Sequence, residues 1–347
     1  MKTKSFFAAA NGYTGFRSYF KEIFEPRKFE RIYVIKGGPG TGKSTLMRNV
    51  CDFLKDEVDL TEKIYCSSDR NSLDGIILHK NNRKIAILDG TSPHETDAKI
   101  PGAIDKIINL GEFFDEKLLI SQRDDIVALN RKKAMHYQNA YEYLRLAGVF
   151  DESIWKKVIG AYTKPDIEFF ESYIKTDKGE QKANCSVRLI NSYGKDGLVA
   201  LNKENFEAAK NYSVKGSFGS ENLFMCSLKS YLDMKKIGYT LYPSPLSDKL
   251  IDGIYISSCD TFITTAFKYE NSVETDRFIS KERLYASIEF IQFCEEEKQK
   301  LLSSSKAEFK KASEEHFALE KIYSSSINFE AQISLIEGIV REIKEIF

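Results

Sequence analysis

The first strong hydrophobic pattern in the chain is a continuous apolar run, Ile32-Tyr33-Val34-Ile35. Such an uninterrupted run is typical of a strand that is covered on both faces, as in a helix-covered parallel sheet. After a glycine-rich turn, apolar residues recur with helical spacing at Leu46, Val50, Phe53 and Leu54. These residues predict a helix that begins near Ser44 and ends near Val58. The segment therefore consists of a strand, a loop and a helix.

Two more apolar runs, Lys63–Cys66 and Ile85–Leu88, predict buried strands, and Ile76–Leu78 is a shorter candidate between them. A parallel sheet covered by helices accommodates these strands most simply. The stretch from Gly111 to about Ala147 contains no proline and is rich in Glu, Lys, Leu and Ala, which predicts helix. From Asp260 onward there is no proline and a single glycine, so we expect an almost wholly helical C-terminal tail.

Short sequence matches recur at a nearly constant distance, which indicates an internal duplication. The distances are 179, 178 and 180 positions. The matched pairs are Ile35-Lys36-Gly37 with Val214-Lys215-Gly216, Asp74-Gly75-Ile76 with Asp252-Gly253-Ile254, and Asn11 with Asn191. We therefore predict two homologous halves that meet near Lys175 to Asn184.

The turn after the first strand satisfies the phosphate-binding pattern G-x-x-x-x-G-K-[ST], with the sequence Gly37-Gly38-Pro39-Gly40-Thr41-Gly42-Lys43-Ser44. Glycines let the backbone N–H groups curl inward around phosphates, and the helix N-terminus adds partial positive charge there. We expect Lys43 to contact the β- and γ-phosphates, Ser44 to bind Mg²⁺ and Thr45 to assist at the α-phosphate. This loop predicts binding of a nucleoside triphosphate, ATP with Mg²⁺.

The Ile85–Leu88 run ends at Asp89, which has the form of a Walker B aspartate and is the second expected Mg²⁺ residue. Many ATPases place a glutamate directly after this aspartate, but here the next residue is Gly90. Water activation then falls to Asp69 or His94 as the candidate base. The alternative for both is an ordinary turn residue.

Arg123 lies near the start of the predicted long helix and is a candidate for stabilising transferred charge. The alternative is an exposed helix arginine with no role in the site.

The second half lacks this chemistry. At an offset of 179 the counterparts of the last three loop positions, Gly42, Lys43 and Ser44, are Glu221, Asn222 and Leu223. A glutamate in this place would repel a triphosphate. The stretch Phe262–Thr265, which matches the Walker B strand, contains no aspartate. The sequence therefore predicts a degenerate second half.

The predicted fold is α/β, with two tandem P-loop NTPase-like parallel sheets covered by helices and long helical segments after each. We expect a domain with intact Walker A and Walker B motifs over residues 1–180. Residues 181–347 form the degenerate domain with its helical C-terminal segment.

The composition of the chain limits the classes of partner that we expect. Lys plus Arg and Asp plus Glu both number 51, so no overall charge favours nucleic acid or an anionic membrane, and nucleic acid is not an expected partner. The six cysteines show no metal-ligand spacing, which suits free thiols in a cytoplasmic protein. No apolar stretch approaches the roughly 18 to 20 residues that span a bilayer. The stretch Asn202–Asn205 lacks the aspartate of a guanine reader, which favours ATP over GTP.

Taken together, these motifs resemble an uncharacterised bacterial family of tandem P-loop ATPases. The resemblance covers nearly the whole chain and is carried by Ile35–Ser44, Cys66–Asp69, Ser72–Gly75, Ala86–His94, Pro101–Ala103, Asn109–Phe113, Ala312–His316 and Leu319-Glu320. It implies a P-loop fold and nucleotide binding. Family members generally carry a phosphate loop in both halves, whereas this chain has lost the second.

Three functions are compatible with these features. The leading hypothesis is an ATPase whose nucleotide state alters the packing of its halves and helices. A kinase that transfers the γ-phosphate to a small molecule or nucleotide is the alternative suggested by Asp69. A nucleotide-gated module with little turnover is the third, in which the tail Lys281–Phe347 binds a protein partner; otherwise the tail packs internally.

Overall fold

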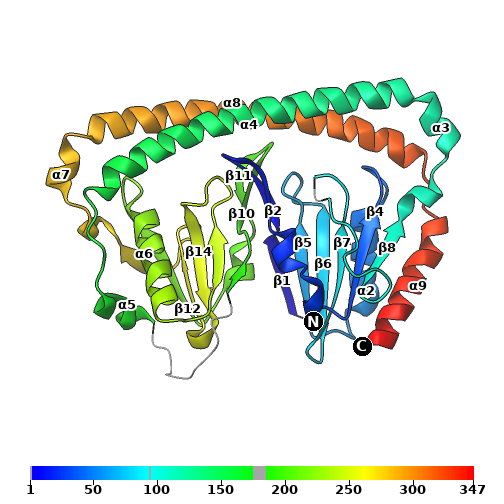
Figure 1. Ribbon diagram of the computed structural model, residues 1–347, viewed down its shortest axis with the longest axis horizontal. Coiled ribbons are helices and arrows are strands. Elements are labelled where there is room, and N and C mark those ends of the chain that lie inside the picture. Colours follow the sequence, from blue (N-terminus) through cyan, green and yellow to red (C-terminus); the bar gives the residue numbers. More distant parts are fainter. Residues whose placement is uncertain (1, 94, 175–184) are drawn as a thin grey trace. The chain divides into compact units, whose positions relative to one another are not determined.

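The computed structural model describes residues 2–93, 95–174 and 185–347 (Figure 1). The chain divides into two compact units, each assembled from segments that are distant in sequence. The first unit contains the chain up to Ala8, Phe20–Asn139 and Ala307–Phe347, and the second contains Ala9–Tyr19 and Ala140–Lys306. The expected junction of the halves, residues 175–184, lies outside the described residues.

This division differs from a single boundary near residue 180. The two longest helices, α4 (Arg123–Ile159) and α8 (Ile288–Ser325), each contribute one part to each unit. The tail from Ala307 onward consequently belongs to the first unit. The early hairpin of β2 (Ala9–Gly12) and β3 (Gly15–Ser18) belongs to the second.

The first unit is built on a six-stranded sheet with the order β1-β5-β6-β7-β4-β8. Its strands are β1 (Lys2–Phe7), β4 (Arg31–Lys36), β5 (Leu60–Tyr65), β6 (Leu73–Lys80), β7 (Arg83–Asp89) and β8 (Asp105–Asn109). The apolar run of β4 is buried, with β7 and the edge strand β8 parallel to it on either side. The predicted buried strand at Ile32–Ile35 is thereby confirmed.

The expectation of a wholly parallel sheet is wrong, because β6 runs antiparallel to both of its neighbours, β5 and β7. The turn between β6 and β7 explains the reversal. It consists of Asn81 and Asn82, with φ of 49° and 64°, and two-residue hairpin turns with positive φ at both positions join antiparallel strands. The sheet is therefore mixed.

The second unit carries a six-stranded sheet of the same design, with the order β16-β12-β15-β14-β13-β9. Its strands are β9 (Ser186–Val187), β12 (Lys210–Lys215), β13 (Thr240–Pro243), β14 (Ile251–Ile256), β15 (Thr261–Thr264) and β16 (Asn271–Glu274). Only β14 is antiparallel to its neighbours, as β6 is in the first sheet. A further hairpin, β10 (Asn191–Gly194) with β11 (Gly197–Ala200), corresponds to β2 with β3. The matching topologies agree with an internal duplication.

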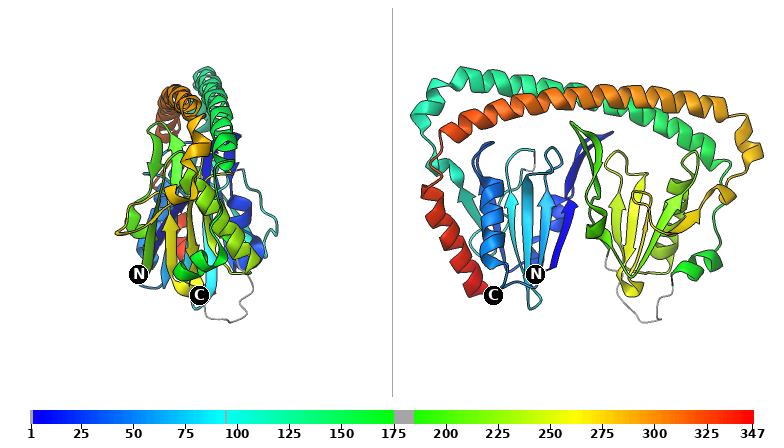
Figure 2. Two further views of the ribbon diagram at one scale, coloured as in Figure 1. Left: turned by 90° about the vertical axis from the view of Figure 1, so that its left-hand side faces the viewer. Right: turned by 180° about the vertical axis from the view of Figure 1, so that it is seen from behind.

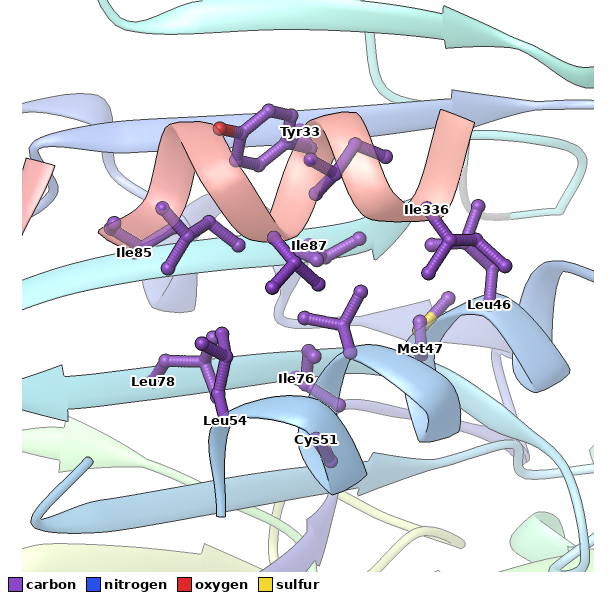
Figure 3. Close-up of a cluster of buried hydrophobic side chains, with 14 of the residues drawn as sticks. Tyr33, Leu46, Met47, Cys51, Leu54, Ile76, Leu78, Ile85, Ile87 and Ile336 are labelled. Carbon is purple, nitrogen blue, oxygen red and sulfur yellow. The ribbon is translucent and has the colours of Figure 1, made fainter. Parts of the chain in front are cut away.

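Helices α2 (Lys43–Leu54) and α9 (Ala331–Ile346) pack together on the first sheet (Figure 2). Figure 3 shows Leu46 and Met47 of α2 near Ile336 of α9, with Leu54 of α2 at the other end of the same cluster, beside Leu78. Phe53, which the sequence pattern placed on the buried stripe, is 59% exposed. The last helix of the chain therefore completes the core beside the glycine-rich loop.

The remaining helices are α1 (Phe20–Ile23), α3 (Glu116–Ser121), α5 (Ile167–Tyr173), α6 (Ser220–Met234) and α7 (Lys281–Tyr285). Helix α6 covers the second sheet as α2 covers the first, and α5 packs beside it. The tail is helical from Lys281, but β15 and β16 show that the helical prediction was wrong for residues 261–274. These strands contain few residues that break helices, so composition alone gave no sign of them.

Candidate functional site

The first glycine loop, Gly37–Ser44, connects the carboxyl end of β4 to the N-terminus of α2. Gly40 and Gly42 have φ of 70° and 87°, a conformation that glycine adopts without strain. The hydroxyl of the buried Thr41 donates to the carbonyl of Gly38 at 2.9 Å and closes the turn. The loop thus presents a compact cradle at a helix N-terminus, where an anion is stabilised.

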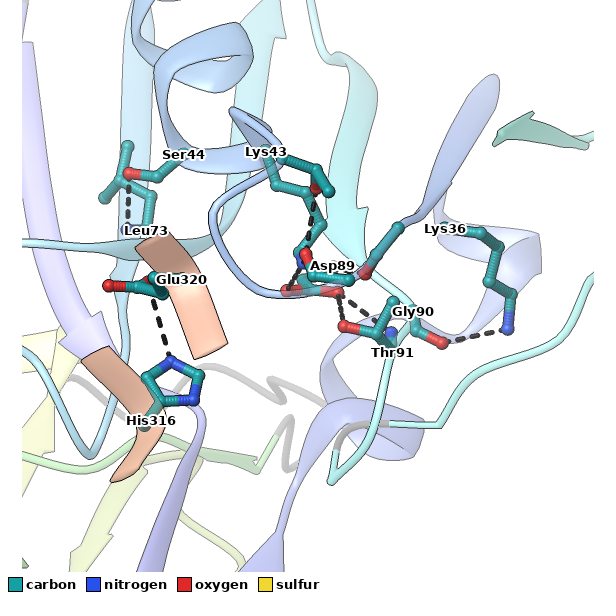
Figure 4. Close-up of polar contacts among 12 residues, drawn as sticks. Lys36, Lys43, Ser44, Leu73, Asp89, Gly90, Thr91, His316 and Glu320 are labelled. Carbon is teal, nitrogen blue, oxygen red and sulfur yellow. Dashed lines mark hydrogen bonds and ion pairs between the residues drawn. The ribbon is translucent and has the colours of Figure 1, made fainter. Parts of the chain in front are cut away.

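Lys43, the first residue of α2, folds back over this cradle (Figure 4). Its ammonium donates to the carbonyls of Gly37 at 2.9 Å and Gly38 at 2.7 Å, and lies 3.6 Å from a carboxylate oxygen of Asp89. Burial raises the pKa of Asp89, and the nearby ammonium of Lys43 opposes the rise. The ammonium can exchange its loop carbonyls for phosphate oxygens without leaving the site.

Asp89 is held in place by the residue two positions later. One of its carboxylate oxygens accepts from the backbone N–H of Thr91 at 2.8 Å and from the Thr91 hydroxyl at 2.5 Å. On α2, the Ser44 hydroxyl accepts from the backbone N–H of Leu73 at 2.9 Å. A serine hydroxyl and an aspartate carboxylate are hard oxygen donors of the kind that Mg²⁺ takes beside phosphates, so these two residues fit the ion. Thr45 is exposed on the first turn of the same helix.

The absence of a glutamate after Asp89 has a steric cause. A Cβ atom on Gly90 would lie 2.4 Å from the Val34 side chain and 2.9 Å from the carbonyl oxygen of Thr96. The backbone N–H of Gly90 also donates to the carbonyl of Ile35 at 2.9 Å. No larger side chain fits at this position, so a glutamate cannot follow Asp89 here.

The two candidate bases, Asp69 and His94, and the candidate charge-stabilising residue, Arg123, have different surroundings. Asp69 closes a turn, because its carboxylate accepts from the N–H of Asn71 at 3.1 Å and its carbonyl accepts from the N–H of Ser72. Arg123 has a side chain that is 77% exposed, and it lies 4.0 Å from the adjacent Asp124. His94 lies outside the described residues. The structure therefore places Lys43 beside Asp89, while the polar contacts seen for Asp69 and Arg123 among the described residues are with their own neighbours in sequence.

Asp74 is a site residue that the sequence reasoning did not select. Gly75 of β6 pairs with Leu88 of β7, so Asp74 lies beside Asp89 at the same edge of the sheet. Asp74 is 5% exposed, and its charge contributes to the raised pKa of Asp89. Its place in the repeated Asp-Gly-Ile motif was the signal that could have found it.

The C-terminal segment covers the first glycine loop. A Cβ atom on Gly38 would lie 3.1 Å from the Tyr323 ring, and one on Gly40 would lie 2.6 Å from the carbonyl oxygen of Glu320. The Gln332 amide donates to the carbonyl of Thr41 at 3.2 Å.

Figure 4 shows Glu320 with its helix partner His316, whose ring lies 3.5 Å from the Glu320 carboxylate. Sequence reasoning placed this segment in the family resemblance but gave it no role in the site. In the structure, the end of α8 and the start of α9 pack against one side of the loop.

The corresponding loop of the second unit is shorter. Four residues separate β12 from α6, whereas six separate β4 from α2. Gly219, with φ of 81°, caps α6 as Gly42 caps α2, so Ser220 takes the place of Lys43 and Glu221 that of Ser44. The sequence alignment paired Lys43 with Asn222, which is two positions too far along the chain. The error arose because a constant offset ignores the two residues that are missing from the second loop.

An internal carboxylate binds the second loop. Asp276 accepts from the backbone N–H of Ser217 at 2.6 Å and from its hydroxyl at 3.0 Å, while Ser220 donates to Thr275 or accepts from it at 2.8 Å. Backbone N–H groups of this kind are the donors that a phosphate would use in an intact loop. The position of Asp89 is taken by Thr265, because Ser213 pairs with Thr264 as Val34 pairs with Leu88.

Comparisons with known proteins add no constraint on these geometries. No protein-family model, no curated protein and no solved structure matches the chain. In the part of the chain that the structure describes, we find no helix of the length and apolar character needed to cross a membrane.

Proposed function

We propose that this protein binds Mg²⁺-ATP at the first glycine loop and hydrolyses it there, as a P-loop NTPase with one site. The observation that carries the proposal is the position of Lys43, between two loop carbonyls and 3.6 Å from Asp89 at the end of the adjacent parallel strand. Bound Mg²⁺ would neutralise charge on the phosphates, with Ser44 and Asp89 as its protein ligands.

The second unit supports a single site rather than two. Ser220 stands in the place of Lys43 and has no ammonium to contact phosphates. Glu221 stands in the place of Ser44, whose hydroxyl is the proposed Mg²⁺ ligand. Asp276 occupies loop donors with a carboxylate that would repel a triphosphate. We propose that this half is a structural or regulatory copy.

The contacts of the tail favour nucleotide gating as the second candidate function. Tyr323, Glu320 and Gln332 all touch the loop that would receive the phosphates. A triphosphate in the loop would therefore alter the packing of α8 and α9, and a protein partner of these helices would sense the nucleotide. A kinase has less support, because Asp69 is engaged in its own turn. All six cysteines are free, which suits a cytoplasmic protein.

The test is Mg²⁺-dependent release of phosphate from ATP by the wild type, Lys43→Ala and Lys55→Ala. Lys55 is an exposed lysine at the end of the same helix, so its replacement controls for the loss of a charge. We expect Lys43→Ala to reduce the rate by roughly a hundredfold or more and Lys55→Ala to leave it unchanged. Equal rates for the wild type and Lys43→Ala would refute hydrolysis at this loop. Transfer of phosphate to an added metabolite instead of water would establish the kinase.

A further inference from the structure

The second unit contains a large cavity beside its shortened loop. The cavity has a volume of about 930 Å³, within the range of small-molecule sites, and all of its lining residues belong to the second unit. Its walls come from the second loop, the hairpin β10–β11, the turn after β2, and the portions of α4 and α8 that belong to this unit. Loss of the phosphate chemistry has therefore not closed the space at this edge of the sheet.

The lining of the cavity includes aromatic side chains. Tyr13, Trp155, Tyr193 and Phe218 all line the cavity, and Trp155 is the single tryptophan of the chain. Tyr13 is held firmly: its hydroxyl donates to Asp151 at 2.7 Å, and its ring packs against Gly148, where a Cβ atom would lie 2.7 Å away. The faces of such rings attract cations.

The charged side chains that line the cavity include more carboxyl groups than lysines. The Lys298 ammonium lies 2.9 Å from Asp151 and 2.7 Å from Glu295, so two carboxylates already share this one cation. The other lining lysines, Lys215 and Lys306, have exposed side chains. An anionic ligand would meet uncompensated negative charge here.

Two further carboxyl groups lie in the wall. The Oε2 atom of Glu221 is buried and has no hydrogen-bond partner among the described residues. Asp252 is buried too, and the Asn191 amide donates to it at 2.6 Å. Burial raises the pKa of both carboxyl groups, with Asp276 and Glu295 adding to the rise at Glu221. A buried carboxylate without enough donors is costly, and a positive charge in the cavity beside Glu221 would offset that cost.

We propose that this cavity binds a small organic cation, one that carries a primary ammonium or guanidinium group, through the Glu221 carboxylate and the aromatic walls. The ligand N–H groups donate to the Glu221 carboxylate, while the rings of Trp155 and the other lining aromatic residues stabilise the positive charge. The second half would then carry a cation site at the place where the first half carries its glycine-rich loop. This inference does not depend on nucleotide binding in the first unit.

Fluorescence of Trp155 provides a direct test on the full-length protein, because the only tryptophan lines the cavity. The probes are putrescine, agmatine and spermidine, with 1,4-butanediol and succinate as neutral and anionic analogues of putrescine. We expect at least one cation to change the fluorescence saturably, with one-to-one stoichiometry by calorimetry at physiological salt. Absence of saturation by all three cations up to about 10 mM, or equal binding of the diol or succinate, would overturn the proposal.

Two matched variants locate the site. Glu221→Gln keeps the shape of the side chain and should weaken cation binding roughly tenfold to a hundredfold. Glu296→Gln, an exposed glutamate on α8 that does not line the cavity, should leave it unchanged. Thermal unfolding verifies that both variants are folded, and unchanged binding by folded Glu221→Gln would contradict the proposal. Lys43→Ala should bind the cation normally, so failure of nucleotide binding and failure of this inference give different results.

Discussion

Replacing Asp252 with asparagine should remove a pH dependence from the stability of the second unit. Burial raises the pKa of Asp252 to about 7, whereas the unfolded chain should titrate near 3.9. The folded protein therefore holds a proton that the unfolded chain releases. The stability that this carboxyl contributes is complete below about pH 4, falls as the pH rises, and is lost above about pH 7.

The magnitude follows from the two pKa values. The full loss is on the order of 4 kcal/mol, and roughly 2 to 3 kcal/mol of it falls between pH 5 and pH 8. An asparagine at position 252 cannot ionise, and it can keep a hydrogen bond to the Asn191 amide. The variant should therefore lose less stability than the wild type over this interval, by about that amount.

The assay is guanidinium unfolding at pH 5 and pH 8, followed by the fluorescence of Trp155. This tryptophan belongs to the second unit, so the signal reports on the unit that contains Asp252. Asp196→Asn, at an exposed turn of the hairpin β10–β11, is the control and should behave like the wild type. If Asp252→Asn and the wild type lose the same stability between the two pH values, the reasoning about this buried carboxyl is wrong.

Two further predictions concern the first unit. Gly40→Ala should destabilise it by roughly 2 to 3 kcal/mol and weaken ATP binding, because the new Cβ atom meets the Glu320 carbonyl. Gly102 also has a positive φ but faces open space, so the control variant Gly102→Ala should cost only about 1 kcal/mol. Urea unfolding monitored by circular dichroism measures both, and equal costs would contradict the contact with α8. Ile339→Ala on α9 should cost roughly 2 to 4 kcal/mol in the same measurement, whereas Ile333→Ala, at a position 56% exposed, should cost under about 1 kcal/mol. A similar cost for both isoleucines would argue against packing of α9 on the core.

The strand, loop and helix around Gly37–Ser44 could be predicted because the signals are local: a buried apolar run, a glycine pattern and helical periodicity. The direction of β6 depended on the turn at Asn81 and Asn82, which the reading of apolar runs did not use. The strands β15 and β16 were missed because the scarcity of proline and glycine there was read as helix. Local patterns therefore identified the centre of the fold but not all of its strands.

The candidate site shows the same limit. Lys43, Ser44 and Asp89 follow from short motifs, but the contacts of Tyr323 and Gln332 with the loop join residues almost three hundred positions apart in the chain. No local pattern encodes such a contact. The alignment of the second loop failed because a constant offset cannot detect a two-residue deletion; the positive φ of Gly219 reveals the true correspondence.

The most direct test of a single functional nucleotide site is the stoichiometry of Mg²⁺-ATP binding, measured by calorimetry on the full-length protein. The account predicts one ATP per chain, lost in Lys43→Ala and retained in Lys55→Ala. Two ATP molecules per chain would contradict the degeneracy of the second loop. Binding that survives in Lys43→Ala would contradict the assignment of the first loop.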